Sequence, residues 1–189
     1  MKKLSRKSSK TTDRTTAKTT GTDRNSQQFL SALADNIPLR FFVSFAGFLF
    51  LLNFFWESLH GLLYLDHQVM PAGSYVPMML EMAGYDTLAA SGFYLFMSRL
   101  NNALVWPLTL RNAALFSSIA LIVACATEYV AVHILHQWAY RPSMPALFGI
   151  GIFPLVQLAA TGLLGIFLAA RITALTIHSS EQSFRPHSR

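Results

Sequence analysis

Apolar residues dominate this chain beyond residue 38, in long runs separated by short segments that contain polar residues, proline or glycine. Each run exceeds the ~20 residues that a helix needs to cross a hydrocarbon core of ~30 Å. The pattern therefore predicts an all-α fold, a four-helix transmembrane bundle. We expect the spans at residues 39–64, 76–97, 112–136 and 146–170, with a kink at Pro154 in the last one.

A stripe of polar residues interrupts the first apolar run. Asn53, Glu57, His60 and Tyr64 follow one another at spacings of four, three and four residues. They would therefore share one face of a helix. An ionisable side chain at membrane depth costs about 2.5–3.5 kcal/mol on insertion scales, so it needs a partner, a proton or a function. We expect the chemistry of the protein to lie along this stripe.

The ends of the chain differ in character from its middle. The whole chain is 52% hydrophobic and only 13% charged, which is typical of a polytopic membrane protein rather than a soluble one. The basic residues flank apolar segments without interleaved aromatics, so no nucleic-acid partner is expected. The pattern predicts a disordered basic tail, a short interfacial helix ending before Pro38, a transmembrane domain and a short cytoplasmic tail. These segments cover residues 1–25, 26–38, 39–171 and 172–189.

The distribution of Lys and Arg predicts the orientation of the spans. With the N-terminus inside, the cytoplasmic segments would hold 14 of these residues and the two outer loops only Arg141. Positive residues favour the cytoplasmic side of a membrane protein. Both termini are therefore expected in the cytoplasm, with the lipid bilayer as the main partner.

In this orientation every span contributes polar groups between the midplane and the outer surface, while no Lys or Arg lies within any span beyond Arg40, at the inner end of the first. Several carboxylates in a low-dielectric layer repel one another. These carboxyl groups must therefore be protonated, paired with histidine, hydrated or arranged around a bound cation. The alternative is that each one only forms a hydrogen bond between helices. The predicted binding layer consists of Asn53, Glu57, His60, Asp86, Glu128 and Gln157.

Four residues are candidates for a metal site because of their ligand type. Glu57, His60, His133 and His136 are residues that bind transition metals. Glu128 and His133, however, lie about 140° apart on a helix that turns ~100° per residue, so they do not face one site together. No bound metal ion is therefore predicted, and the sequence identifies neither a cofactor nor a catalytic residue.

Three functions fit this pattern. The first is binding or translocation of a small ligand, proton or cation in the acid-rich layer. The second is a membrane enzyme that acts on a lipid or isoprenoid, with Glu57 or Asp86 as general acid or base and His60 as its partner. The third is an accessory subunit whose acids only join helices.

Several short motifs together resemble a group of small, multi-spanning bacterial membrane proteins with no assigned activity. The similarity covers residues 39–171. It implies a compact helical protein of the bacterial cytoplasmic membrane and supplies no catalytic residue. The motifs are Asn53-Phe54-Phe55-Trp56-Glu57, Gly84-Tyr85-Asp86, Glu128, Trp138-Ala139-Tyr140, Met144-Pro145, Gly149-x-Gly151, Pro154 and Gln157.

Overall fold

The computed structural model describes the backbone of residues 13–184 and the side chains of residues 36–175. The chain forms two units, Met1–Pro38 and Leu39–Arg189. The described part of the first unit is helical and belongs to α1 (Asp13–His60). The second unit holds the remainder of α1 and all other elements.

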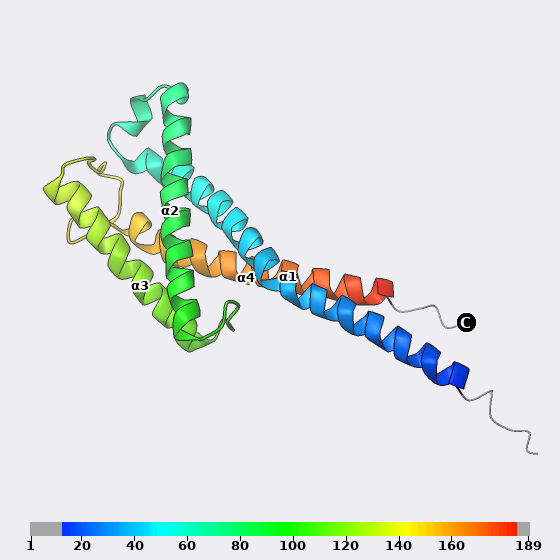
Figure 1. The fold of residues 1–189 in the computed structure, drawn as a ribbon. Coiled ribbons are helices and arrows are strands. Elements are labelled where there is room, and N and C mark those ends of the chain that lie inside the picture. The colour runs from blue at the N-terminus through cyan, green and yellow to red at the C-terminus, as the bar shows by residue number, and fades with distance from the viewer. Residues whose placement is uncertain (1–12, 185–189) are drawn as a thin grey trace, which may run out of the picture. The chain divides into compact units, whose positions relative to one another are not determined.

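Helices make up most of the second unit (Figure 1), as the all-α expectation requires. After α1 come α2 (Ala72–Leu100), α3 (Leu110–Tyr129) and α4 (Ile152–Phe184). In the view of Figure 1, α2 crosses in front of α4, and α4 also packs against α3.

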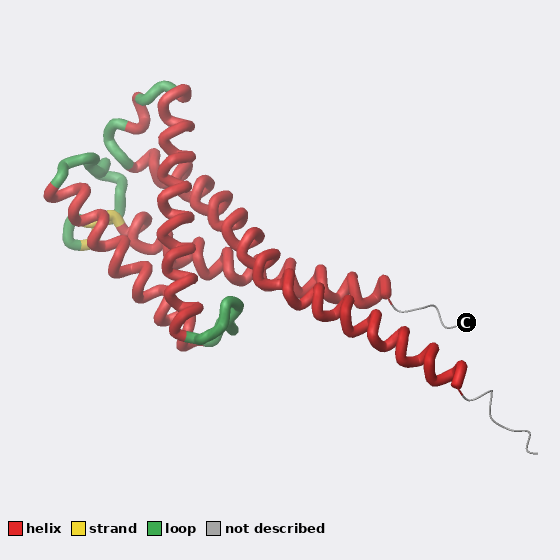
Figure 2. Tube along the Cα trace, viewed as in Figure 1, coloured by secondary structure: helices red, strands yellow, loops and turns green. Residues whose placement is uncertain are grey.

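Short elements connect these helices. Two single turns of 3-10 helix, η1 (Gly61–Leu63) and η2 (His67–Val69), lie between α1 and α2. A π-helical turn, η3 (Val130–Ile134), extends α3. Among the described residues the only strands are β1 (Ala146–Leu147) and β2 (Ile150–Gly151), an antiparallel hairpin before α4 (Figure 2).

Three helical segments are long and apolar enough to cross a membrane: Asn36–Leu63, Leu110–Ile134 and Ile152–Leu175. The helix α2 has 29 residues, or about 43 Å at ~1.5 Å per residue, which is also a sufficient length. It is not among the segments that are apolar enough in the described chain, and it carries Glu81, Asp86 and Arg99. Length and composition therefore confirm three of the four expected spans, and the second span stays a prediction.

The N-terminal boundary differs from the expected one. Helix α1 continues through Pro38 without a break, so the helix end that we predicted there is absent. Proline costs a helix one backbone hydrogen bond, but its fixed φ near −65° is helical, so a long helix can include it. Of the predicted disordered tail, residues 1–12 lie outside the described residues and residues 13–25 belong to α1. The interfacial position of residues 26–38 stays a prediction.

The last span also begins later than expected, because residues 146–151 form the hairpin and α4 starts at Ile152. The two central residues of the turn, Phe148 and Gly149, have φ values of 52° and 78°. Positive φ at both positions matches the twist of a two-residue hairpin. Pro154 consequently lies in the first turn of α4, where its missing N–H has no helical partner to lose. The kink that we expected at Pro154 is therefore not required.

An aromatic cluster fixes how α1 and α2 pack. Phe41 and Phe45 of α1 lie 5.4 and 4.8 Å from Tyr94 of α2, measured between ring centroids. Trp106, in the loop after α2, stacks on Tyr94 at 5.1 Å. The Tyr94 hydroxyl donates to the backbone oxygen of Leu104 at 2.7 Å. All four rings are buried, so the cluster fixes the rotation of both helices and the direction of the acids about two to three turns away.

Helix α4 approaches its neighbours through small residues. A Cβ atom at Gly162 would lie 2.5 Å from Cε1 of Phe116 in α3, and one at Gly165 would lie 3.4 Å from Phe45 and Leu49 of α1. Small residues allow helix backbones to come this close in a membrane. Gln157, four residues before Thr161 on the buried side of α4, is thereby held against the other helices.

Substitution of Gly162 by Ala should lower the free energy of unfolding by about 1–3 kcal/mol, the usual cost of overpacking a tight core. The reason is that the Phe116 ring is fully buried and cannot move aside. Unfolding by SDS in mixed micelles, followed by circular dichroism, measures the change. Gly92→Ala is the matched control, because a Cβ there meets nothing within 4 Å. Equal stability of the two variants would contradict the packing described.

Candidate functional site

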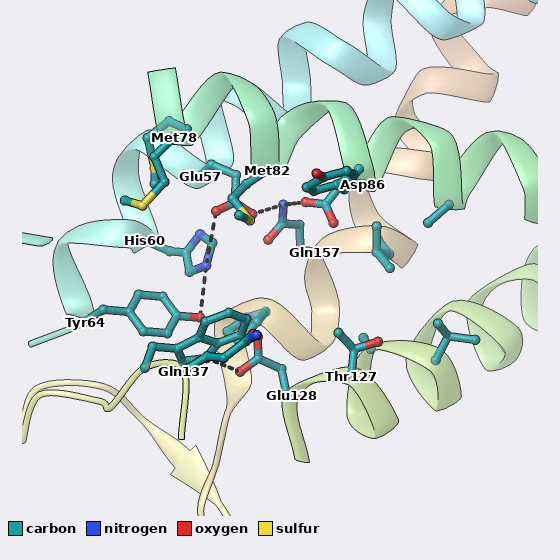
Figure 3. A pocket seen from close by; sticks show the side chains of 18 of the residues that line it. Glu57, His60, Tyr64, Met78, Met82, Asp86, Thr127, Glu128, Gln137 and Gln157 are labelled. Atoms are coloured by element: carbon teal, nitrogen blue, oxygen red, sulfur yellow. Dashed lines mark hydrogen bonds and ion pairs between the residues drawn. The ribbon is translucent and has the colours of Figure 1, made fainter. Parts of the chain in front are cut away.

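A cavity of about 570 Å³ lies among the four helices, at the end where η1 and the loop before β1 are found. This volume is in the usual range for small-molecule sites. In Figure 3, Met78, Met82 and Asp86 project into it from α2, and Thr127 and Glu128 from α3. No Lys or Arg is among the described residues that line it.

Gln157 joins two of the acids in what we call the carboxyl junction, formed by Glu57, Asp86 and Gln157. The Gln157 Nε2 atom donates to Oε1 of Glu57 at 2.7 Å and to Oδ2 of Asp86 at 2.5 Å. A side-chain amide has two N–H donors, so both are used. The three side chains come from α1, α2 and α4. A neutral residue, rather than a positive one, thus holds two carboxyl groups together.

His60 turns one ring nitrogen towards the junction. Its Nδ1 atom lies 3.0 Å from the backbone oxygen of Trp56. A carbonyl oxygen only accepts hydrogen bonds, so Nδ1 carries the proton and Nε2 has a free lone pair in the neutral ring. Nε2 lies 3.9 Å from Oε2 of Glu57 and 3.5 Å from the Tyr64 hydroxyl. Nε2 is therefore the ring nitrogen of His60 that faces Glu57 and Tyr64.

Glu128 faces the cavity from α3 and is held by two ring donors. Trp138 donates its indole N–H to Oε2 of Glu128 at 3.3 Å, and the Tyr140 hydroxyl donates to the same oxygen. Burial, followed by this hydrogen bond, raises the pKa of Tyr140 above its ordinary value of 10.0. The Tyr140 hydroxyl therefore keeps its proton and remains a donor to Glu128 through the neutral pH range.

Backbone pairing joins two loop segments at this end of the cavity. Tyr64 and Tyr140 form an isolated antiparallel β-bridge. On either side of it, the Leu65 N–H donates to the Ala139 oxygen at 3.0 Å, and the Arg141 N–H donates to the Leu63 oxygen at 2.9 Å. The rings of Tyr64 and Tyr140 lie 5.4 Å apart between centroids. The segment after α1 and the segment before β1 are thereby joined over the acids.

Five of the six residues of the predicted binding layer line this one cavity: Glu57, His60, Asp86, Glu128 and Gln157. The sixth, Asn53, lies one helical turn before Glu57 on α1 and does not line it. Its side chain is fully buried, and neither amide atom has a hydrogen-bond partner among the described residues. Its role in ligand binding stays a prediction.

The histidines of the alternative metal set do not come together. His60 lines the cavity, whereas His133 packs beside Tyr129 with 5.1 Å between ring centroids. His136 is exposed and its Nδ1 bonds the Val132 oxygen at 3.1 Å. His133 lies within the π turn η3 and His136 follows it. A π turn holds more residues than an α-helical turn, so it changes the direction of these side chains. Among the described residues, no group of three or more His, Cys, Asp or Glu side chains is arranged to hold a metal ion.

Sequence reasoning missed the apolar and aromatic walls. Met78 and Met82 line the cavity on α2, and Trp138 lines it rather than serving only at a membrane interface. The signal for the methionines was present, because Met78, Met82 and Asp86 are spaced by four residues and share one helix face. No local signal predicted Trp138, since its contact with Glu128 depends on how the loop after η3 folds back.

No protein-family model, curated protein or solved structure matches this chain. Function is therefore inferred from the cavity itself. Three carboxyl groups and two imidazoles, those of His60 and His67, line a common volume and can exchange protons or balance a positive charge. No Lys or Arg among the described lining residues offers a permanent positive charge to an anion.

Proposed function

We propose that this chain is an integral membrane protein that crosses the bilayer four times, with both termini in the cytoplasm. Three helices that are long and apolar enough to span support the proposal. The length of α2, and its contacts with α3 and α4, support a fourth crossing. The strong bias of Lys and Arg to the predicted cytoplasmic segments supports the orientation. The cavity would then lie in the outer half of the membrane.

The proposed activity is the binding, or translocation, of a small ligand that carries positive charge, with protons exchanged at the same acids. One observation carries this proposal: Glu57, Asp86 and Glu128, from three helices, line a single cavity. No Lys or Arg is among the described residues that line it. In a low-dielectric site, negatively charged carboxylates are strongly unfavourable unless they are protonated or neutralised by a cation. A positive ligand and a proton are therefore alternative occupants, which is the basis of proton-coupled exchange.

The surrounding residues have distinct parts in this exchange. Gln157 holds Glu57 and Asp86 at a fixed separation, so that one cation can contact both. His60, with Nε2 near Oε2 of Glu57, can accept the proton that a cation displaces. The Tyr64 hydroxyl continues this chain of polar groups away from His60. A proton released at the junction thus has an acceptor within the cavity.

The experiment compares uptake of a monovalent organic cation, tetraethylammonium, into vesicles that carry the wild-type chain, Glu57→Gln or Asp86→Asn. Each isosteric change should reduce pH-driven uptake at least tenfold, because it removes a carboxyl group without removing volume. Asp66→Asn, at an exposed position outside the cavity, is the control and should behave as wild type. Trypsin cleavage of the basic N-terminal residues, expected only from the cytoplasmic face, reports orientation in the same vesicles. Full uptake and binding by both cavity variants would refute the proposal.

A second candidate is a membrane enzyme that acts on a lipid or isoprenoid by acid–base chemistry. The observation in its favour is the Nδ1 hydrogen bond of His60, which leaves a basic Nε2 beside Glu57 and Tyr64. Under this alternative Glu57→Gln would leave ligand binding intact and stop turnover. An accessory role, the third alternative, would leave only a loss of stability in the same variant.

A further inference from the structure

The cavity reaches the surface at two places, at Gln137 in the loop after η3 and on its side between α2 and α3. Tyr85 of α2 and Val123 of α3 line the cavity, yet 57% and 36% of their surfaces are exposed. Thr127, one turn after Val123 on α3, also lines it and is exposed. A residue that is both exposed and part of the lining marks a place where the cavity reaches the surface. We call this place, bounded by Tyr85, Val123 and Thr127, the α2–α3 opening.

The position of the opening decides what can reach it. Val123 lies within Leu110–Ile134, one of the segments apolar enough to cross a membrane. Ile122, next to it, is 67% exposed, as expected of a lipid-facing side chain. In the proposed membrane orientation, an opening at this level of α3 faces the hydrocarbon part of the bilayer. At the other end of the cavity, where Gln137 is exposed, the segments that hold Tyr64 and Tyr140 are joined by backbone hydrogen bonds.

The lining of the cavity combines two kinds of side chain. The apolar ones include Met78, Met82 and Ala89 of α2, together with Ala124 of α3 and Leu158 of α4. Methionine side chains are flexible and adapt to apolar ligands of different shapes. The polar ones include the carboxyl junction and Glu128, and the aromatic rings of Tyr64 and Trp138 line the same cavity. Aromatic faces beside acids favour an organic ammonium group, which combines charge attraction with cation–π contact.

The volume agrees with this combination of side chains. About 570 Å³ is the size of a site for a ligand of many heavy atoms, far more than a single metal ion needs. The acids also fail to converge as metal ligands among the described residues. A small hydrophilic cation would leave the methionine wall empty, and an anionic lipid would meet three carboxyl groups.

From these features we infer that the ligand is a cationic amphiphile, with one ammonium head and an apolar body, that enters from the bilayer through the α2–α3 opening. This inference rests on the proposed function, because it names the class of cation that the cavity takes. The ammonium head lies against Glu57 and Asp86, and the apolar body lies against Met78, Met82 and the other apolar residues of the lining.

The test measures binding of tritiated dodecyltrimethylammonium to the full chain in phosphatidylcholine nanodiscs, with empty nanodiscs subtracted. Saturable binding with one site per chain is expected. Unlabelled tetramethylammonium, which has the head alone, should compete at least tenfold more weakly. Dodecanol, which has the chain alone, should not compete at the same concentration. Asp86→Asn and Glu57→Gln should each weaken binding at least tenfold, and Asp66→Asn should leave it unchanged.

The route of entry has its own matched pair of variants. Val123→Trp places a large ring at the α2–α3 opening and should slow association at least fivefold. Ile122→Trp adds the same ring one residue away, outside the described lining, and should leave the rate unchanged. Equal effects of both variants would refute entry between α2 and α3.

The outcomes separate this inference from the proposed function. Equally tight binding of tetramethylammonium and dodecyltrimethylammonium would refute the amphiphile and leave a cation-binding cavity. Equal competition by dodecanol would show that the head is not recognised and refute both. Saturable binding that neither Asp86→Asn nor Glu57→Gln weakens would place the ligand elsewhere and likewise refute both.

Discussion

Replacement of Gln157 by Leu should abolish cation binding and lower the free energy of unfolding by about 3 kcal/mol. The magnitude corresponds to two hydrogen bonds to charged groups at about 1.5 kcal/mol each, the lower end of their range. Leucine has a similar length but no donor, so Glu57 and Asp86 would lose the N–H groups that now lie 2.7 and 2.5 Å away. Gln157 is only 3% exposed, so water cannot readily replace it.

Two measurements test this result: SDS-induced unfolding in mixed micelles, and binding of the tritiated ammonium probe in nanodiscs. Gln68→Leu is the control. Its Nε2 donates to the Leu62 oxygen at 3.2 Å, but the side chain is exposed, and we expect a change in stability within about 0.5 kcal/mol. If Gln157→Leu were as stable as the wild type and bound the probe equally well, the carboxyl junction would have no organising role.

The second large effect is expected at high pH and depends on Tyr140. Because burial and Glu128 raise its pKa above 10.0, the folded chain keeps the Tyr140 proton when the unfolded chain releases it. The unfolded state then binds fewer protons, so the free energy of unfolding falls as pH rises above about 10. The slope is at most about 1.4 kcal/mol per pH unit. Solvent around this half-buried ring reduces it, and below pH 10 Tyr140 contributes no pH dependence.

Tyr140→Phe isolates this contribution. The variant should lack the alkaline slope of Tyr140 and, at pH 7, be less stable by about 1.5 kcal/mol, since Glu128 loses one of its two ring donors. Tyr129→Phe serves as the control, because Tyr129 is 52% exposed and makes no side-chain hydrogen bond to Glu128. The difference between variant and wild-type unfolding curves, recorded from pH 7 to 11, gives both quantities. Identical slopes for wild type and Tyr140→Phe would contradict a protonated, buried hydroxyl.

Local patterns account for the elements and for the residues on each helix face. The apolar runs predicted three of the helices as membrane-crossing segments, because length and composition are properties of consecutive residues. Helical spacing grouped Glu57 and His60 on one face of α1, and both line the cavity. Helical spacing does not apply where the backbone leaves the α-helical period. The π turn η3 changes the direction of His133 and His136 in a way that their spacing does not predict.

The sequence alone thus determined the helical class, the apolar lengths of three helices and the concentration of acids in predicted spans that hold no Lys or Arg beyond Arg40. Only the tertiary structure decided that Gln157 joins Glu57 to Asp86 and that the Trp138–Tyr140 segment returns to Glu128. The reason is physical. Spacing fixes which side of its own helix a residue occupies, whereas the contact between residues 57 and 157 depends on how α1 and α4 rotate and approach. That geometry is set by the buried aromatic cluster at Tyr94 and the small residues of α4, and no local pattern reveals which helices these residues bring together.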